Sequence, residues 1–203
     1  MARMATDVVL LPDETMMDRM IEINRQLVRE CSSEIALNRR DYLPHISLAM
    51  GCIERRDIDA IRETLAQIAE ASPVGQLTAT GIEVSANSQG GKTSLLEIER
   101  TAELRTLHER IMQEMKRFFS HDVENATFYD DVVAETTQDW VRRYPEKAAY
   151  EQFRPHITLG SGQAKPESPF PIGFRAARLA LCHLGNHATC RRILAEANLA
   201  AGD

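Results

Sequence analysis

Two short segments of the chain match each other, and this internal match is the strongest constraint on the fold. Segments 44–48 (PHISL) and 155–159 (PHITL) agree at every position if Ser and Thr are counted as equivalent. Their histidines lie 111 residues apart (156 − 45), and each segment sits at a similar depth in its own half of the chain. The match therefore predicts a duplicated architecture with two lobes.

Each segment alternates polar and apolar residues, which is typical of a β-strand with two different faces. Side chains along a strand point alternately to opposite sides. His45 and Ser47 are therefore expected on one face of the first strand. His156 and Thr158 are expected on one face of the second, while the Ile and Leu residues of both segments point into the core. Two such strands facing a cleft would line it with two imidazoles and two hydroxyls.

The rest of the chain predicts a mixture of helices and antiparallel hairpins. Apolar residues recur at helical spacing after Asp13, Asp57 and Thr101, residues that can cap a helix. Helices and hairpins do not alternate as regular βαβ units, which favours an α+β fold. We expect one domain over residues 1–203. The expected strands are about 7–11, 44–48, 76–85, 93–99, 155–160, 174–184 and 188–197.

Residues 120–152 interrupt this pattern, and we interpret them as an insertion. Residues 120–139 contain six acidic side chains and no Lys or Arg, and the following residues include the only tryptophan, Trp140. The segment is either a lid over the cleft or a solvated excursion. We favour the lid, because long insertions in compact domains tend to be functional or disordered.

Composition excludes several classes of protein. With 43% hydrophobic residues, the chain can form a core, so it is not intrinsically disordered. Its apolar runs are far shorter than the roughly 20 residues that span a bilayer, so no membrane association is expected. A net charge of −6 argues against binding long nucleic acid through many phosphates, although not against a small phosphate ligand. The oligomeric state cannot be deduced from the sequence.

The cysteines and the first residues predict a cytoplasmic protein with reduced thiols. Cys31, Cys52, Cys182 and Cys190 form no CxxC pair, and four cysteines in a chain of this length are no disulfide framework. The first residues include no apolar secretory core before Asp7.

Two histidines and two hydroxyls in one cleft suit phosphoester chemistry without a metal or cofactor. Histidine titrates near neutral pH, so one imidazole can accept a proton while the other donates one. In-line attack on phosphorus needs these groups on opposite sides of the phosphate. The hydroxyls of Ser47 and Thr158 can donate hydrogen bonds to the non-bridging oxygens. Sequence alone does not show whether His45 or His156 is the base.

The two tetrads, His45 to Leu48 and His156 to Leu159, resemble those of the two-histidine (2H) phosphoesterase superfamily. This superfamily includes 2′–5′ RNA ligase-like proteins and 2′,3′-cyclic nucleotide phosphodiesterases. The resemblance implies a bilobed α+β fold in which two antiparallel sheets face a central cleft and helices lie outside. It also implies that His45 and His156 are the acid–base pair and that Ser47 and Thr158 bind phosphate. The implied substrate is a nucleotide or short RNA with a 2′,3′-cyclic phosphate or a 2′–5′ linkage.

The chain departs from the superfamily pattern directly after the second tetrad. RNA ligase-like members often continue as Ala-Arg, whereas this chain has Gly160 and Ser161. An arginine expected near the phosphate is therefore missing at that position. Arg154, Lys92 and Arg39 are the candidates to replace it.

Several alternatives stay open at this point. The same fold could be a nucleotide or RNA-end binding module without turnover. It could also be a metallohydrolase that uses histidine and the acids of residues 122–139. Tyr42 and Phe153 precede the tetrads and could either stack on a base or pack in the core. A weaker candidate is a zinc site, because four potential ligands crowd one predicted hairpin: Cys182, His183, His187 and Cys190.

Overall fold

A computed structural model describes residues 3–31, 33–72, 74–86, 91–165 and 169–199. Seven strands and five α-helices lie within these residues. The strands are β1 (Arg3–Pro12), β2 (Ile46–Glu54), β3 (Gln76–Ala86), β4 (Lys92–Ile98), β5 (His156–Ser161), β6 (Ile172–Leu184) and β7 (Cys190–Asn198). The helices are α1 (Glu14–Cys31), α2 (Ile58–Ala71), α3 (Ala102–Met115), α4 (Glu135–Arg142) and α5 (Tyr144–Lys147). The four 3₁₀ turns are η1 (Arg55–Asp57), η2 (Asn125–Thr127), η3 (Tyr150–Gln152) and η4 (Asn186–Ala188).

All seven strands belong to one antiparallel sheet with the order β1-β2-β5-β4-β3-β6-β7. The α+β class is confirmed. The two sheets implied by the family resemblance are two halves of this single sheet, for two reasons. The 13-residue strand β6 pairs with β3 through its first residues and with β1 and β7 through the rest. Strand β2 also meets β5, at the single pair Ile46 and Ile157.

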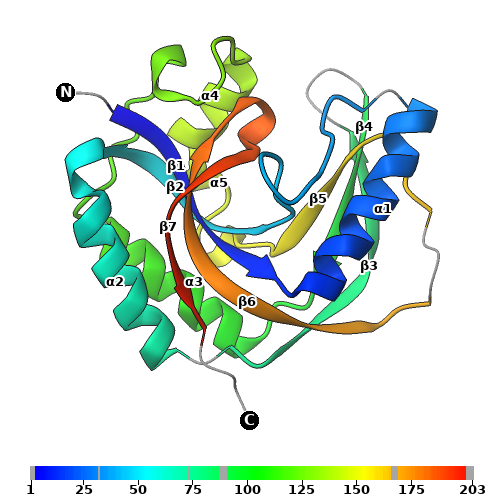
Figure 1. The fold of residues 1–203 in the computed structure, drawn as a ribbon, viewed down its shortest axis with the longest axis horizontal. Coiled ribbons are helices and arrows are strands. Elements are labelled where there is room, and N and C mark those ends of the chain that lie inside the picture. The colour runs from blue at the N-terminus through cyan, green and yellow to red at the C-terminus, as the bar shows by residue number, and fades with distance from the viewer. Residues whose placement is uncertain (1–2, 32, 73, 87–90, 166–168, 200–203) are drawn as a thin grey trace.

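Helices α1, α2 and α3 cover the outer faces of the sheet, as expected. Helix α1 packs against β5, α2 against β6 and β7, and α3 against β2 (Figure 1). Helix α1 begins where the Asp13 carboxylate accepts a hydrogen bond from the backbone N–H of Met16. Thr101 caps α3 in the same way through the N–H of Leu104. The side chain of Asp57, by contrast, makes no capping hydrogen bond to α2.

Strand β1 runs through the centre of the core. The predicted apolar stretch from Val8 to Leu11 is fully buried, and the strand extends further in both directions than the sequence pattern predicts. Two polar residues, Thr6 and Asp7, are fully buried on the same strand. The Thr6 hydroxyl donates a hydrogen bond to the carbonyl oxygen of Gly51, whereas Asp7 belongs to the candidate site described below.

Residues 120–152 form a folded unit that contains η2, α4, α5 and η3. Helices α4 and α5 both pack against β2. Val123, Phe128, Val141 and Tyr144 are buried, so this segment is not a solvated excursion. That the segment is an insertion into a single domain stays a prediction.

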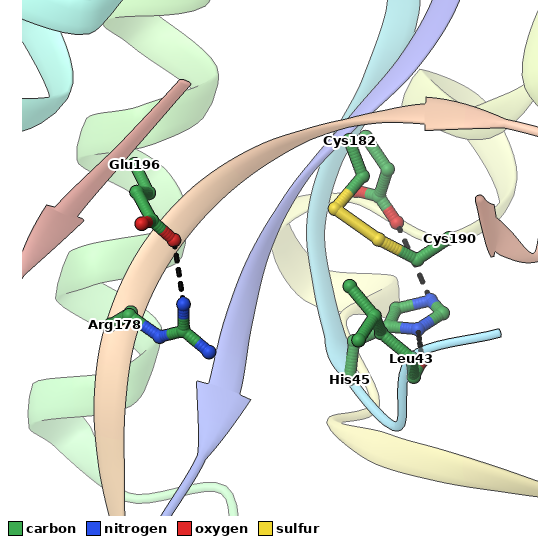
Figure 2. The surroundings of a disulfide bond; sticks show 7 residues. Leu43, His45, Arg178, Cys182, Cys190 and Glu196 are labelled. Carbon is green, nitrogen blue, oxygen red and sulfur yellow. Dashed lines mark hydrogen bonds and ion pairs between the residues drawn. A yellow bond between two sulfur atoms is a disulfide. The ribbon is translucent and has the colours of Figure 1, made fainter. Parts of the chain in front are cut away.

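The expectation that all thiols are reduced is wrong for one pair. Cys182 and Cys190 form a disulfide across the β6–β7 hairpin, with their Cα atoms 5.5 Å apart (Figure 2). The turn between the two strands brings these residues together, and their spacing in the sequence gives no sign of it. Cys31 and Cys52 are free thiols, the first exposed and the second buried.

None of the described helices is both long and apolar enough to span a lipid bilayer. The cytoplasmic location stays a prediction, and it no longer rests on reduced thiols.

Candidate active site

All four residues predicted for the site line one cavity of about 1130 Å³. Its floor is formed by β2, β5 and the neighbouring strands β4 and β3, and one wall comes from α4 and α5. His45 and Ser47 line the cavity from the start of β2. His156 and Thr158 line it from β5. The structure therefore brings the two tetrads together.

The strand register explains why the four side chains share this cavity. Ile46 is paired with Ile157 in the antiparallel contact between β2 and β5, and both isoleucines are buried. In such a pairing their sequence neighbours point to the opposite face, toward the cavity. His45 lies one residue before β2 begins, slightly outside the strand that the sequence predicts.

The two imidazoles are held in the same way. Nδ1 of His45 lies 2.7 Å from the carbonyl oxygen of Leu43, and Nδ1 of His156 lies 2.8 Å from that of Arg154. A carbonyl oxygen only accepts hydrogen bonds, so Nδ1 carries the proton in both rings. In a neutral imidazole Nε2 is then the unprotonated nitrogen. Each Nε2 can therefore accept a proton or, once protonated, donate one.

Both imidazoles favour the neutral form in the free protein. Burial lowers the pKa of His45 to about 4, the Leu43 carbonyl opposes this shift, and the charge of His156 adds to it. Burial also lowers the pKa of His156, and nearby Arg154 lowers it further, while the Arg154 carbonyl, Glu83 and Glu97 oppose the shift. A bound phosphate would favour protonation of one ring, because it places a negative charge beside it.

A family model described as the 2′-5′ RNA ligase superfamily matches residues 22–181, which include both tetrads. The chain belongs to this superfamily. The resemblance of the tetrads to those of two-histidine phosphoesterases is thereby confirmed.

Solved structures confirm the fold of this superfamily member. TT0787 of Thermus thermophilus aligns with a TM-score of 0.62 and 15% identity, over 98% of this chain and 100% of that chain. E. coli LigT in its apo form aligns with a TM-score of 0.50 and 12% identity, over 98% and 99% of the two chains. At such identities the likeness concerns the fold alone. A comparison with curated proteins gives no significant match.

The superfamily member also has a buried carboxyl group beside His45, which the sequence analysis missed. Asp7 Oδ2 lies 4.0 Å from His45 Nε2, and Asp7 is fully buried. Among the described residues, neither carboxyl oxygen has a hydrogen-bond partner with normal geometry. Burial raises the pKa of Asp7 well above its ordinary value, against the opposite effect of the Ser47 hydroxyl. The only signal in the sequence is an acidic residue next to a run of apolar ones.

The disulfide lies next to the first tetrad. Cys190 lines the cavity, and its carbonyl oxygen accepts a hydrogen bond from the N–H of Leu43, at 3.1 Å. Leu43 in turn accepts the hydrogen bond from His45 (Figure 2). The disulfide-linked end of β7 therefore anchors the loop that positions this imidazole.

Of the three candidates named from the sequence to replace the missing arginine, only Arg154 lines the cavity. Ser161 lines the cavity after the second tetrad. Arg39 forms ion pairs with Glu14 and Asp18 on α1, and Lys92 donates to Gln163. Arg154 lines the cavity, but its guanidinium is paired with carboxylates on β3 and β4: Glu83 at 2.5 Å and Glu97 at 3.5 Å.

The zinc alternative fails because its four residues are used elsewhere. Both cysteines are joined in the disulfide. His183 Nε2 lies 2.9 Å from the Thr127 carbonyl oxygen, and His187 Nε2 lies 2.9 Å from Glu34. In the part of the chain that the structure describes, no three potential ligand side chains form a metal-binding group.

The two aromatic candidates for base stacking both border the cavity but differ in accessibility. Phe153 is buried and its ring stacks on His108, with centroids 4.0 Å apart, so it belongs to the core. Tyr42 lines the cavity, and the guanidinium of Arg191 covers its ring at 3.9 Å from the centroid. Trp140 also lines the cavity, a position that the sequence analysis did not assign to it.

Proposed function

We propose that this superfamily member is a metal-independent phosphoesterase. Its substrate would be a nucleotide or short RNA that carries a 2′,3′-cyclic phosphate or a 2′–5′ linkage. One observation carries the proposal: two imidazoles with identical Nδ1 contacts line one cavity together with two hydroxyls. Membership of the superfamily supports it.

The proposed reaction is hydrolysis by acid–base catalysis. One neutral imidazole accepts a proton from water, and the water oxygen forms a bond to phosphorus. The bond between phosphorus and the leaving ribose oxygen breaks, and the second imidazole, in its protonated form, donates a proton to that oxygen. Ser47 and Thr158 donate hydrogen bonds to the non-bridging oxygens, where negative charge must be held. In the reverse direction a ribose hydroxyl takes the place of water.

Small ligands fit the charge of the molecule better than long nucleic acids do. The chain has a net charge of −6, which disfavours the many phosphate contacts that a long polyanion requires. We therefore propose mononucleotides and short oligonucleotides as partners.

A second candidate function is a nucleotide-binding module without turnover. Two observations favour it: Ser161 follows the second tetrad in place of an arginine, and Arg154 is paired with carboxylates. Both leave less positive charge for stabilising a transition state.

A panel of substrates tests the proposal in the presence of EDTA. It contains 2′,3′-cyclic nucleotides, RNA with a 2′,3′-cyclic end, ADP-ribose cyclic phosphate and 2′–5′ oligonucleotides. We expect turnover by the wild type, and a loss of about 10²–10⁴-fold in His45→Ala and in His156→Ala. His121→Ala is the matched control, because this half-buried histidine does not line the cavity. Its Nε2 contacts the carbonyl oxygen of Met50 instead.

Three outcomes would count against the phosphoesterase. Turnover retained by both catalytic variants would contradict the roles of the histidines. Activity abolished by the chelator would favour a metallohydrolase. Saturable binding of a cyclic nucleotide with no product after long incubation would favour the binding module.

A further inference from the structure

The cavity wall formed by α4 and α5 contains a partly exposed tryptophan. Trp140, on α4, lines the cavity and is 38% exposed, whereas most large apolar side chains of this protein are buried. Its ring meets that of Tyr144 edge-on, with centroids 6.5 Å apart and planes at 88°. Tyr144 is only 2% exposed. A buried neighbour therefore holds the orientation of an indole that is itself accessible.

Lys147 follows on the same wall and brings an uncommitted positive charge. It lies at the end of α5 and lines the cavity. Among the described residues, no hydrogen bond or ion pair involves its ammonium group. Of the other cations in the lining, Arg100 donates to backbone carbonyls of η3, and Arg154 is paired with two carboxylates.

The acidic residues on this wall do not neutralise Lys147, because they have other partners. Glu135 forms an ion pair with Arg142 at 2.7 Å. Asp139 lies 3.9 Å from Arg143. The cavity wall therefore combines an accessible aromatic ring with a cation that has no partner among the described residues. Proteins that bind single-stranded nucleotides commonly combine these two kinds of group.

This inference rests on the proposed function. We propose that Trp140 and Lys147 form the nucleotide-recognition site of the cavity, in which the indole stacks on an unpaired base and the ammonium group contacts a phosphate oxygen. Lys147 then supplies the positive charge that Ser161 cannot. The site selects a nucleoside phosphate over a sugar phosphate that lacks a base.

The other charges of the lining restrict the ligand further. Five carboxylates face three cations in the cavity: Glu34, Glu83, Glu97, Glu135 and Asp139 against Arg100, Lys147 and Arg154. This balance disfavours ligands with several phosphates, because like charges repel in a partly enclosed site. The favoured substrate is a nucleoside with a single, singly charged cyclic phosphate.

Intrinsic fluorescence tests the site directly, because Trp140 is the only tryptophan of the chain. The His45→Ala/His156→Ala protein, in which the ligand is not turned over, is titrated with 2′,3′-cyclic AMP and with inorganic phosphate. We expect saturable quenching by the nucleotide and none by phosphate. In the same background, Lys147→Ala should raise the Kd about 10-fold. Lys116→Ala, an exposed lysine outside the cavity lining, should leave it unchanged.

Calorimetry covers the variants that remove the fluorophore. Trp140→Ala should raise the Kd for 2′,3′-cyclic AMP by 10-fold or more, and Trp140→Phe, which keeps an aromatic face, should raise it by less than 3-fold. The site is refuted if both Trp140→Ala and Lys147→Ala bind as tightly as the parent protein. Equal quenching by phosphate alone would also refute it, because the base would then play no part.

The outcomes separate this site from the proposed function. If Trp140→Ala and Lys147→Ala turn over the substrate as fast as the wild type does, the recognition site is refuted but the phosphoesterase proposal is not. Quenching by the nucleotide without any turnover in the wild type would overturn the phosphoesterase and leave the recognition site standing.

Discussion

At the scale of single residues, the site depends on how burial sets the charge of each side chain. His45 and His156 are both shifted toward the neutral form, and Asp7 is shifted toward its neutral, protonated form. Low polarity disfavours any charge that lacks a partner, so the same burial has opposite effects on the pKa of a base and of an acid.

The pKa values of the imidazoles predict an acidic optimum for catalysis. The proposed reaction needs one protonated and one neutral histidine, and both pKa values lie below the ordinary 6.5, that of His45 at about 4. The proportion of free enzyme in the active protonation state therefore falls as the pH rises above 6.5. We expect kcat/KM to be highest below pH 6.5 and to fall roughly 10-fold per unit at higher pH. An optimum above pH 7.5 would contradict these shifts.

Asp7 predicts an unusual dependence of stability on pH. Its pKa in the folded state is raised above the ordinary 3.8, so the folded protein holds the proton more tightly than the unfolded chain does. The contribution of protonated Asp7 to the free energy of unfolding is therefore complete below about pH 4 and is lost as the pH rises toward the folded-state pKa. Asp7→Asn cannot ionise. The free energy of unfolding of Asp7→Asn should therefore rise relative to the wild type by about 1–3 kcal/mol between pH 4.5 and 7.

Urea unfolding at pH 4.5, 5.5 and 7 measures this difference. Tyr144 and His45 are the titratable groups that face Asp7, and the variant retains both. Asp59→Asn, which removes an exposed carboxylate on α2, is the control. Its free energy of unfolding should change with pH in the same way as that of the wild type. Parallel curves for Asp7→Asn as well would mean that Asp7 is ionised in the folded protein.

The sequence predicts some of these residues and not others, for a physical reason. The alternation in the two tetrads is local, so the shared faces of His45 with Ser47 and of His156 with Thr158 can be deduced from a few neighbouring positions. Asp7 approaches His45 only because β1 pairs with β2. That contact depends on strand order, which a single sequence does not show.

At the scale of elements, the departure after the second tetrad has a structural cause. Gly160 has a φ of +131°, which only glycine adopts without strain, at a bulge between β5 and β4. A Cβ atom at this position would lie 2.8 Å from Ser33 Oγ and 2.9 Å from Asn24 Nδ2. Asn24, on α1, donates a hydrogen bond to the Leu159 carbonyl oxygen, and Ser33, two residues beyond the end of α1, accepts one from the N–H of Ser161. The alanine that superfamily members often have here does not fit this chain.

Gly160→Ala should therefore destabilise the protein by about 1–3 kcal/mol. It should also lower turnover, because β5 presents His156 and Thr158 to the cavity. Gly75→Ala is the matched control, since a Cβ atom there meets nothing within 4 Å. Chemical denaturation of both variants measures the difference, and equal stabilities would show that β5 adapts to the side chain.

The β6–β7 hairpin leads to a prediction about covalent structure. The disulfide joins residues separated by 8 positions, and closing a loop of this size stabilises a protein by about 2–3 kcal/mol. Cys182→Ala/Cys190→Ala should lose about that much in urea unfolding, whereas Cys31→Ala, an exposed free thiol, should lose none. Alkylation of the unfolded wild type without reductant should label two thiols. Labelling of all four would show that the bond does not form.

The boundaries of the elements follow the sequence where the apolar pattern is regular. The predicted helix positions Met16, Met20, Ile23 and Leu27 form the buried face of α1, while Cys31 at its end is exposed. Within residues 120–152 the pattern is weaker, because α4 and α5 are short and Pro145 lies within the single turn of α5. The sequence therefore identifies this segment as distinct but does not place Trp140 or Lys147 at the cavity.

At the scale of the whole molecule, the duplication predicts two lobes but not their connection. Strand β6 pairs with β3 near its start and with β1 further along, and these partners belong to different halves of the sheet. Such pairings join residues that are distant along the chain, and the local pattern of β6 is the same whichever strands flank it. The cleft could therefore be expected from the sequence, whereas the single sheet around it could not.

The narrow contact between β2 and β5 has a consequence for the spacing of the two imidazoles. The two tetrads adjoin a junction of one residue pair, and the remaining connection runs the long way round, through β1, β6, β3 and β4. These six strands form a closed circuit. The distance between the two imidazoles therefore depends on the geometry of all six strands. A change in the curvature of β6, on the far side of the circuit, would alter that distance.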